Sequence, residues 1–253
     1  MAHVHEKVTF DGTGGRLSGT LQIPDTAPRG GVVLAHCFTC SKSLKVTRGL
    51  ATGIEDGGYA VLRFDFTGLG ESEGDFADTS VTSNIGDLEA AARFMEDRGL
   101  GPCAMVGHSL GGAATLLAAG TVPTVRAVTA VAAPFNPDHV RHLFAEEDVD
   151  RALASGRVTV KIAGRPFQIS AEFFHDLERH CSPERIAALG RPLLVVHGTA
   201  DRVVGIEEGE RIFAAARQPR WFTAIPDGDH LFVQPRHAER AAAAIVTFLD
   251  TVL

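Results

Sequence analysis

Cysteines, long apolar runs and blocks of positive charge are all scarce in this chain of 253 residues. Its four cysteines are too few to hold a chain of this length together as a disulfide scaffold. No apolar stretch approaches the roughly 18 residues that a membrane-spanning helix requires. The formal net charge of −7 and the lack of a Lys/Arg block give no electrostatic surface for nucleic acid. The sequence therefore argues against a disulfide-rich domain, a membrane protein and a nucleic-acid-binding protein.

The composition favours one globular domain that acts on a small molecule. Hydrophobic residues make up 45% of the chain, which is enough for one substantial core, so we expect a single domain over residues 1–253. Residues 1–7 lack the basic start and apolar run of a secretory signal, which favours a cytoplasmic location. The acidic balance suits a neutral or apolar small molecule better than a polyanion.

Strand-like and helix-like segments alternate along most of the chain. Residues 4–10 and 16–23 alternate between apolar and polar residues on either side of a Gly-rich turn, which is typical of an antiparallel hairpin. Apolar runs indicate further strands at residues 31–35, 59–64, 103–106, 125–132, 192–196 and 221–225. Helical spacing of apolar residues occurs at residues 44–55, 81–98, 110–119 and 238–253. This order predicts an α/β fold with a mostly parallel, doubly wound sheet covered by helices on both faces.

Residues 135–191 are too long for an ordinary crossover between two strands, which needs about one helix and short loops. The segment has structure signals of its own. Val158, Val160 and Ile162 alternate with polar residues, and Ser170 is placed to cap a helix. We expect a lid of helices and a hairpin, inserted into the domain where it can cover an active site.

A glycine-flanked serine follows one of the expected strands. Gly107-His108-Ser109-Leu110-Gly111 matches the pattern G-x-S-x-G and directly precedes an expected helix. Glycines permit the sharp turn that lifts the serine hydroxyl clear of a sheet, and the helix N-terminus favours developing negative charge. A chance match in a glycine-rich chain is the alternative, but the strand and helix on either side argue against it. We therefore predict that Ser109 is a nucleophile.

An acid and a base follow this serine in the order that the motif requires. Asp201 and His230 each lie in the loop after a later apolar run. Loops at the carboxyl ends of such strands converge on one crevice, so we predict Ser109, Asp201 and His230 as a catalytic triad. Asp138 also follows an expected strand and is an alternative acid, although Pro137 beside it is typical of a helix start.

A tetrahedral intermediate needs two preorganised N–H donors for its negative oxygen. Leu110, at the start of the helix after Ser109, is expected to supply one donor, and the loop after residues 31–35 is expected to supply the other. That loop contains Cys37 and Phe38. We predict that the second donor is the Phe38 N–H, with the Cys37 N–H as the alternative.

Several of these segments together resemble the α/β-hydrolase superfamily. They are GVVLAHCFTCSKS at residues 31–43, VLRFDFTGLGESEGDF at 61–76, VGHSLGGAA at 106–114, and the loops around Asp201 and His230. The stretches HCFTCSK, RFDFTGLG and IAGRPFQI are similar, more narrowly, to the hydrolase part of bacterial two-domain proteins that carry an OsmC-type redox domain behind it. The resemblance implies the same nucleophile, acid and base, and an oxyanion donor in the Phe38 loop. Because the chain ends after the closing helix, we expect no redox domain in it.

The sequence departs from the superfamily pattern at Cys37, where many of these hydrolases have glycine. Cys37 and Cys40 form a C-x-x-C beside the expected oxyanion donor. One hypothesis is redox gating, in which a disulfide rearranges the donor loop and lowers turnover. The alternative is a pair of small, buried thiols. A zinc site would need a second Cys/His pair with suitable spacing, which the sequence does not offer.

These residues predict acyl transfer to water without a cofactor or a metal ion. The expected substrate is a small carboxylic ester with an apolar portion, because the expected lid is rich in phenylalanine. Candidate substrate contacts are Phe38, His108, Phe135 and Phe173, although His108 and the lid phenylalanines could instead serve packing. A thioesterase, an amidase or a peptidase would use the same triad, and a slow ligand-sensing homologue would also keep it.

Overall fold

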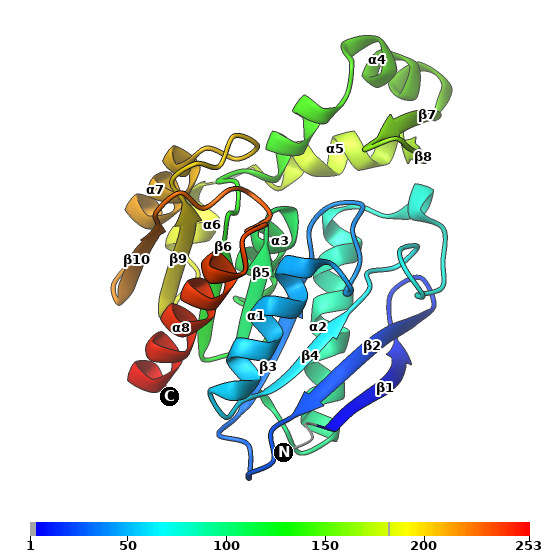
Figure 1. The fold of residues 1–253 in the computed structure, drawn as a ribbon. Coiled ribbons are helices and arrows are strands. Elements are labelled where there is room, and N and C mark those ends of the chain that lie inside the picture. The colour runs from blue at the N-terminus through cyan, green and yellow to red at the C-terminus, as the bar shows by residue number, and fades with distance from the viewer. Residues whose placement is uncertain (1–3, 182) are drawn as a thin grey trace.

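Eight strands form one sheet within residues 4–181 and 183–253, the part of the chain that the computed structural model describes (Figure 1). Their order across the sheet is β1-β2-β4-β3-β5-β6-β9-β10. The strands are β1 Val4–Asp11, β2 Arg16–Ile23, β3 Gly31–Ala35, β4 Ala60–Phe64, β5 Pro102–His108, β6 Ala127–Val131, β9 Leu193–Gly198 and β10 Arg220–Ile225. β1 and β2 form the expected antiparallel hairpin, β2 pairs antiparallel with β4, and the remaining pairs are parallel.

Helices cover both faces of this sheet because its central strands are buried on both sides. Along β3, Val32 and Leu34 pack into one cluster with helices α1 and α8, whereas Val33 and Ala35 pack into another with α2, α3 and α7. The helices are α1 Lys45–Asp56, α2 Val81–Asp97, α3 Leu110–Ala118, α7 Ile206–Ala215 and α8 Pro235–Val252. The expected doubly wound α/β fold is confirmed. Helix α7, which the apolar spacing did not predict, completes the crossover from β9 to β10.

The winding of the sheet reverses between β3 and β5. From β3 the chain passes through α1 to β4 on one side, and then through α2 back to β5 on the other side of β3. The register of the two neighbours places Ala35 opposite Gly107, so the loops after both strands leave the sheet together. Such a switch point is where open α/β sheets bind their ligands.

The insertion, residues 135–191, leaves the sheet after β6 and returns to β9. It contains η2 Pro137–Leu143, α4 Glu146–Ser155, β7 Arg157–Ile162, β8 Arg165–Ser170, α5 Ala171–Arg179 and α6 Pro183–Ala187. β7 and β8 form the expected antiparallel hairpin, and Ser170 Oγ caps α5 by accepting a hydrogen bond from Phe173 N at 3.2 Å. The expected cap and hairpin are both present.

The insertion has a small apolar core of its own, which also contacts the main domain. Val160, Phe174 and Leu177 belong to one cluster with Leu110 and Ala113 of α3. Figure 1 accordingly shows α4, α5 and the β7–β8 hairpin at one end of the molecule, beyond α2 and α3. A short helix, η1 Phe76–Asp78, contacts β8 from the main domain. None of the helices in the described part of the chain has the length and hydropathy to cross a bilayer.

Candidate active site

Ser109 lies on a strained turn between β5 and α3. Its backbone has a φ of 57° and a ψ of −127°, a conformation that L-residues rarely adopt. The turn is close-packed, since a side chain at Gly107 would collide with the carbonyl oxygen of Gly111, and one at Gly111 would collide with that of His36. Ser109 N donates to Val131 O at 2.9 Å, which ties the turn to β6. The two glycines of the motif are therefore required by close contact.

Hydrogen bonds connect Ser109, His230 and Asp201 in one chain. His230 Nε2 lies 3.1 Å from Ser109 Oγ, and His230 Nδ1 lies 2.8 Å from Asp201 Oδ2. The other carboxylate oxygen of Asp201 accepts the N–H groups of Val203 and Val204, each at 2.9 Å. With both oxygens engaged, the carboxylate holds the imidazole with its Nδ1–H toward Asp201 and its Nε2 free to accept the serine proton.

The pKa of Asp201 lies below its ordinary value. Burial on its own would raise that pKa, but His197, whose Nε2 is 3.6 Å from Asp201 Oδ2, and the hydrogen-bonded His230 both lower it. The Val204 N–H lowers it further. Asp201 is thus an anion at neutral pH.

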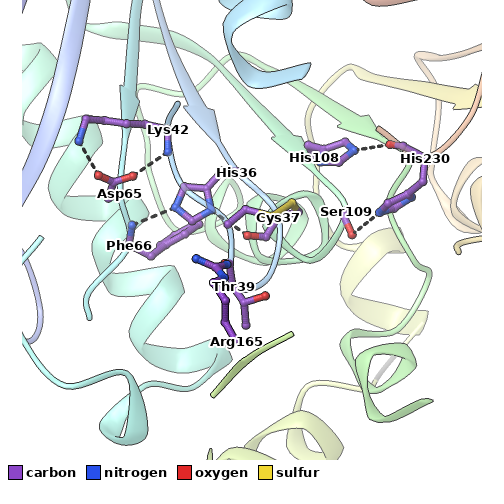
Figure 2. Close-up of a disulfide and its surroundings, with 11 residues drawn as sticks. His36, Cys37, Thr39, Lys42, Asp65, Phe66, His108, Ser109, Arg165 and His230 are labelled. Atoms are coloured by element: carbon purple, nitrogen blue, oxygen red, sulfur yellow. Dashed lines mark hydrogen bonds and ion pairs between the residues drawn. A yellow bond between two sulfur atoms is a disulfide. The ribbon is translucent and has the colours of Figure 1, made fainter. Parts of the chain in front are cut away.

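His108 is fully buried and hydrogen-bonds to the backbone of His230. Its Nε2 lies 2.7 Å from His230 O, and the two rings are 5.0 Å apart (Figure 2). Burial first, and the neighbouring His230 next, lower the pKa of His108 to about 3, so it is neutral and its Nε2–H donates to that carbonyl. His108 therefore holds the backbone of His230 in place. It is not among the residues that line the cavity at Ser109, so the expected substrate contact is not seen there.

Asp138, the alternative acid, does not replace Asp201 in this arrangement. It lies in η2 of the insertion, and its Oδ1 is buried without a hydrogen-bond partner among the described residues. The Nδ1 of His230 is taken by Asp201. Asp201, the acid that the order serine, acid, histidine predicts, is therefore the carboxylate that binds the His230 ring.

A cavity of about 90 Å³ lies at Ser109. It opens between the main domain and the insertion, and its mouth is apolar because Leu143 and Val203 are 49% and 54% exposed. His139 Nε2 lies 2.9 Å from Val203 O and so links the two sides. The residues that line the cavity are Phe38, Ser109, Leu110, Pro134, His139, Val140, His142, Leu143, Val203 and Val204.

The loop that carries Phe38 is a tight turn closed by a disulfide. Cys37 and Cys40 form a disulfide, with their Cα atoms 5.5 Å apart, and Cys40 N donates to Cys37 O at 3.3 Å. Between them, Thr39 has a φ of 57°, which a β-branched residue adopts only when its surroundings hold it. Arg165 of the insertion donates to Thr39 O, and Figure 2 shows the two residues next to each other. The bonded pair is compatible with a Phe38 that lines the cavity beside Ser109 and Leu110.

The sequence model of the alpha/beta hydrolase family matches residues 32–244, which include this whole site. The chain belongs to the alpha/beta hydrolase family. Its fold is similar to the crystal structure of the esterase domain from a Rhodothermus marinus protein, with 37% identity, a TM-score of 0.77 and coverage of 97% of each chain. The narrower likeness to two-domain proteins with an OsmC-type domain stays a prediction.

Two curated relatives match over shorter stretches. The uncharacterized protein YfhR of Salmonella typhi is 28% identical over 201 residues, 76% of this chain and 62% of that protein. The mitochondrial palmitoyl-protein thioesterase ABHD10 of Mus musculus is 26% identical over 155 residues, 58% of this chain and 50% of that protein. The chain thus matches less than two thirds of the length of either relative.

Two phenylalanines that the sequence suggested as substrate contacts do not line the cavity at Ser109. Phe135 packs instead beneath Arg211, whose guanidinium carbon is 4.4 Å from the ring centre. Phe173 is 4% exposed and stacks on Phe38, with the ring centres 5.4 Å apart. Phe173 therefore supports the one phenylalanine that does face the cavity.

Proposed function

We propose that this alpha/beta hydrolase cleaves small carboxylic esters through an acyl-enzyme on Ser109. The observation that carries the proposal is the hydrogen-bonded chain from Ser109 Oγ through the His230 ring to Asp201. Such a chain activates a serine hydroxyl, because the imidazole accepts its proton while the carboxylate stabilises the resulting cation.

In the proposed reaction, His230 takes the proton of Ser109 as Oγ attacks the ester carbonyl. The negative oxygen of the tetrahedral intermediate accepts hydrogen bonds from the N–H groups of Leu110 and Phe38, two residues that line the cavity with Ser109. Protonated His230 then gives its proton to the leaving alcohol. Water repeats the sequence on the acyl-enzyme, with His230 as base, and releases the carboxylic acid.

The cavity supports a small substrate with an apolar portion. Its volume is about 90 Å³, and most of the side chains around it are apolar. The insertion forms part of its wall through Val140 and Leu143, so we propose that the insertion acts as the lid of the site. The esterase domain from Rhodothermus marinus, 37% identical, supports the choice of an ester.

Thioester hydrolysis is the second candidate, and the likeness to the mouse palmitoyl-protein thioesterase favours it. The triad does not separate the two reactions, because they differ in the leaving group. The small cavity at Ser109 favours a short acyl group over a palmitoyl chain.

A panel of p-nitrophenyl esters, acyl thioesters and aminoacyl amides tests the proposal, with Ser109→Ala as the matched background. We expect the highest kcat/KM on short-chain esters and no turnover above background in Ser109→Ala. Higher kcat/KM on thioesters would favour the second candidate. The folded wild type could instead hydrolyse none of these compounds and show a higher melting temperature in their presence. That result would favour a ligand sensor over an enzyme.

A further inference from the structure

A buried ion pair lies next to the loop that carries Phe38, and none of the proposed chemical steps uses it. Lys42 is 4% exposed and Asp65 is 1% exposed. Lys42 follows the Phe38 turn, and Asp65 follows β4. Burying two charges is costly unless each is paired and hydrogen-bonded, so the pair needs a physical reason for its place.

Asp65 binds Lys42 by both its backbone and its side chain. Asp65 Oδ1 accepts the Lys42 N–H at 2.6 Å, and Oδ2 accepts the Lys42 ammonium. Glu71 N donates to the same Oδ2 at 3.0 Å. The loop after β4 closes tightly around this carboxylate, since Gly70, with a φ of 57°, has no room for a Cβ against it.

Further contacts hold Lys42 from its other sides. The Arg63 guanidinium donates to Lys42 O at 2.7 Å. The ammonium also lies 2.8 Å from Glu71 Oε2 and 3.1 Å from Ser18 Oγ. The N–H, the carbonyl and the side chain of Lys42 are therefore all engaged by groups from β2, β4 and the loop after β4. Lys42 is a fixed point where the Phe38 loop ends.

The beginning of the same loop is fastened to the residue after Asp65. His36 Nδ1 donates to Cys37 O at 2.8 Å, and His36 Nε2 accepts the Phe66 N–H at 3.3 Å. One neutral tautomer satisfies both bonds, and burial lowers the pKa of His36, which keeps the ring neutral. Figure 2 shows His36 and Lys42 reaching the neighbouring residues Phe66 and Asp65.

We propose that Asp65 is a positioning residue for the reaction, acting through Lys42 to hold the Phe38 N–H toward Ser109. The proposal rests on the function proposed above. An oxyanion donor works only when it is preorganised, so the loop must not relax when charge develops. The left-handed Thr39 in this loop would otherwise relax toward a more common conformation, and the anchor at Lys42 opposes that change.

Asp65→Asn tests the proposal, because it keeps the size of the side chain and removes the charge that binds the Lys42 ammonium. We expect kcat on p-nitrophenyl acetate to fall by about 10-fold to 100-fold, less than the loss of a whole donor. KM should change by less than about two-fold, since the oxyanion forms only in the transition state. The affinity for an alkyl boronic acid, which forms a tetrahedral adduct on the serine, should fall by the same factor as kcat.

Asp87→Asn is the matched control for a loss of stability alone. Asp87 is also fully buried and also accepts three hydrogen bonds, from Thr13 N, Thr13 Oγ1 and Thr67 N. It lies in α2 and does not bind the Phe38 loop. We expect a lower melting temperature in both variants, with kcat retained in Asp87→Asn. An equal loss of kcat in Asp87→Asn would overturn the positioning role.

A double-mutant cycle with Phe38→Pro shows whether Asp65 acts through the donor. When proline has removed the Phe38 N–H, Asp65→Asn should lower kcat no further. Full additivity of the two effects would contradict the proposal. If Asp65→Asn does not fold, Lys42→Gln takes its place. This variant loses the ammonium but keeps the hydrogen bonds from the backbone N–H groups of residue 42 and Glu71 to Asp65. It should lower kcat in the same way.

The cycle also separates this inference from the proposed function. A folded Asp65→Asn with wild-type kcat would overturn the positioning role, while an inactive Ser109→Ala in the same assay would leave the esterase proposal intact. Retained turnover in Ser109→Ala would instead remove the function on which the inference rests.

Discussion

His230 Nδ1 and Asp201 Oδ2 lie 2.8 Å apart although the two residues are 29 positions apart along the chain. Each residue follows a strand, β9 or β10, and these two strands are parallel neighbours in the sheet. Helix α7 returns the chain between them, so both loops emerge at the same edge. The contact that orients the imidazole is therefore a consequence of the crossover topology.

Asp201→Asn should lower kcat/KM on the best ester substrate by a factor on the order of 10³–10⁴, because an amide no longer holds the His230 ring in the required tautomer. Asp138→Asn is the matched control and should change kcat/KM little, since Asp138 does not bind the imidazole. Steady-state kinetics of the two folded variants measure both effects. If Asp138→Asn were the inactive variant, the acid would belong to the insertion.

Phe38→Ala and Phe38→Pro separate the side chain of Phe38 from its N–H. Alanine keeps the donor, so kcat should be largely retained while KM rises through lost packing against the substrate. Proline removes the donor and should lower kcat by about 10²–10³. A thermal melt must show that the proline variant folds, because proline also restricts the loop. Near-normal kcat in a folded Phe38→Pro would place the second donor elsewhere, with the Cys37 N–H as the next candidate.

The state of the Cys37–Cys40 pair should control turnover in the direction opposite to the sequence hypothesis. That hypothesis had oxidation displacing the donor loop, whereas in the structure the bonded pair closes the turn that carries Phe38 into the cavity. We predict that a dithiol reductant lowers kcat reversibly. The reductant is oxidised to its own disulfide, while the Cys37–Cys40 bond is reduced to two thiols.

Cys40→Ser should show the lower kcat at all times and should not respond to reductant or oxidant. Cys181→Ser is the matched control, because Cys181 lies in the insertion and is not disulfide-bonded; it should respond as the wild type does. Mass spectrometry of alkylated protein reports the state of the pair. Unchanged kcat after complete reduction of the pair would refute the prediction.

Protonation of His108 should make the free energy of unfolding depend on pH. Burial lowers its pKa in the folded protein to about 3, whereas the unfolded chain titrates near 6.5. Between these values only the unfolded chain binds the proton. The stability that neutral His108 contributes is therefore complete above about pH 6.5 and is lost as the pH falls toward 3.

Urea unfolding at pH 7 and pH 5 measures this effect, with His108→Gln as the comparison. The wild type should lose about 2 kcal/mol more than the variant between the two values of pH. Equal losses in the two proteins would mean that His108 is already protonated in the folded state or titrates normally there.

The order of expected strands and helices, with Ser109, Asp201 and His230 placed after strands, was sufficient to predict the fold class and the residues that meet at Ser109. Each of Ser109, Asp201 and His230 follows a strand end, and strand ends of a doubly wound sheet meet at one edge. The motif glycines also carried a local signal, because Gly107 and Gly111 are needed for close packing whatever the rest of the fold.

The part of the cavity lining that the insertion contributes could not be predicted, because it depends on how the insertion packs. His139, His142 and Leu143 face Ser109 only through the path of η2 over the sheet edge. Phe173 was expected at the substrate, yet its helix α5 places it behind Phe38. Such placements follow from long-range packing, which leaves no periodic signal in the sequence.

Lys42 and Asp65 show the same limit for buried polar groups. In the sequence they are ordinary charged residues, 23 positions apart. Their burial and pairing follow only from the position of the loop after β3 beside the loop after β4. A charged residue directly after a buried strand was the one available signal, and the same signal fits solvent-exposed loop residues equally well.

Covalent labelling of Ser109 tests the proposed mechanism most directly. A fluorophosphonate probe reacts with a serine that a neighbouring base activates. After incubation with wild-type protein, mass spectrometry should show one adduct per chain, on the peptide that contains Ser109, and hydrolysis of p-nitrophenyl acetate should stop in proportion to labelling. Ser109→Ala, at an unchanged melting temperature, should neither label nor turn over. An adduct on another residue, or ester hydrolysis retained by folded Ser109→Ala, would contradict Ser109 as the nucleophile.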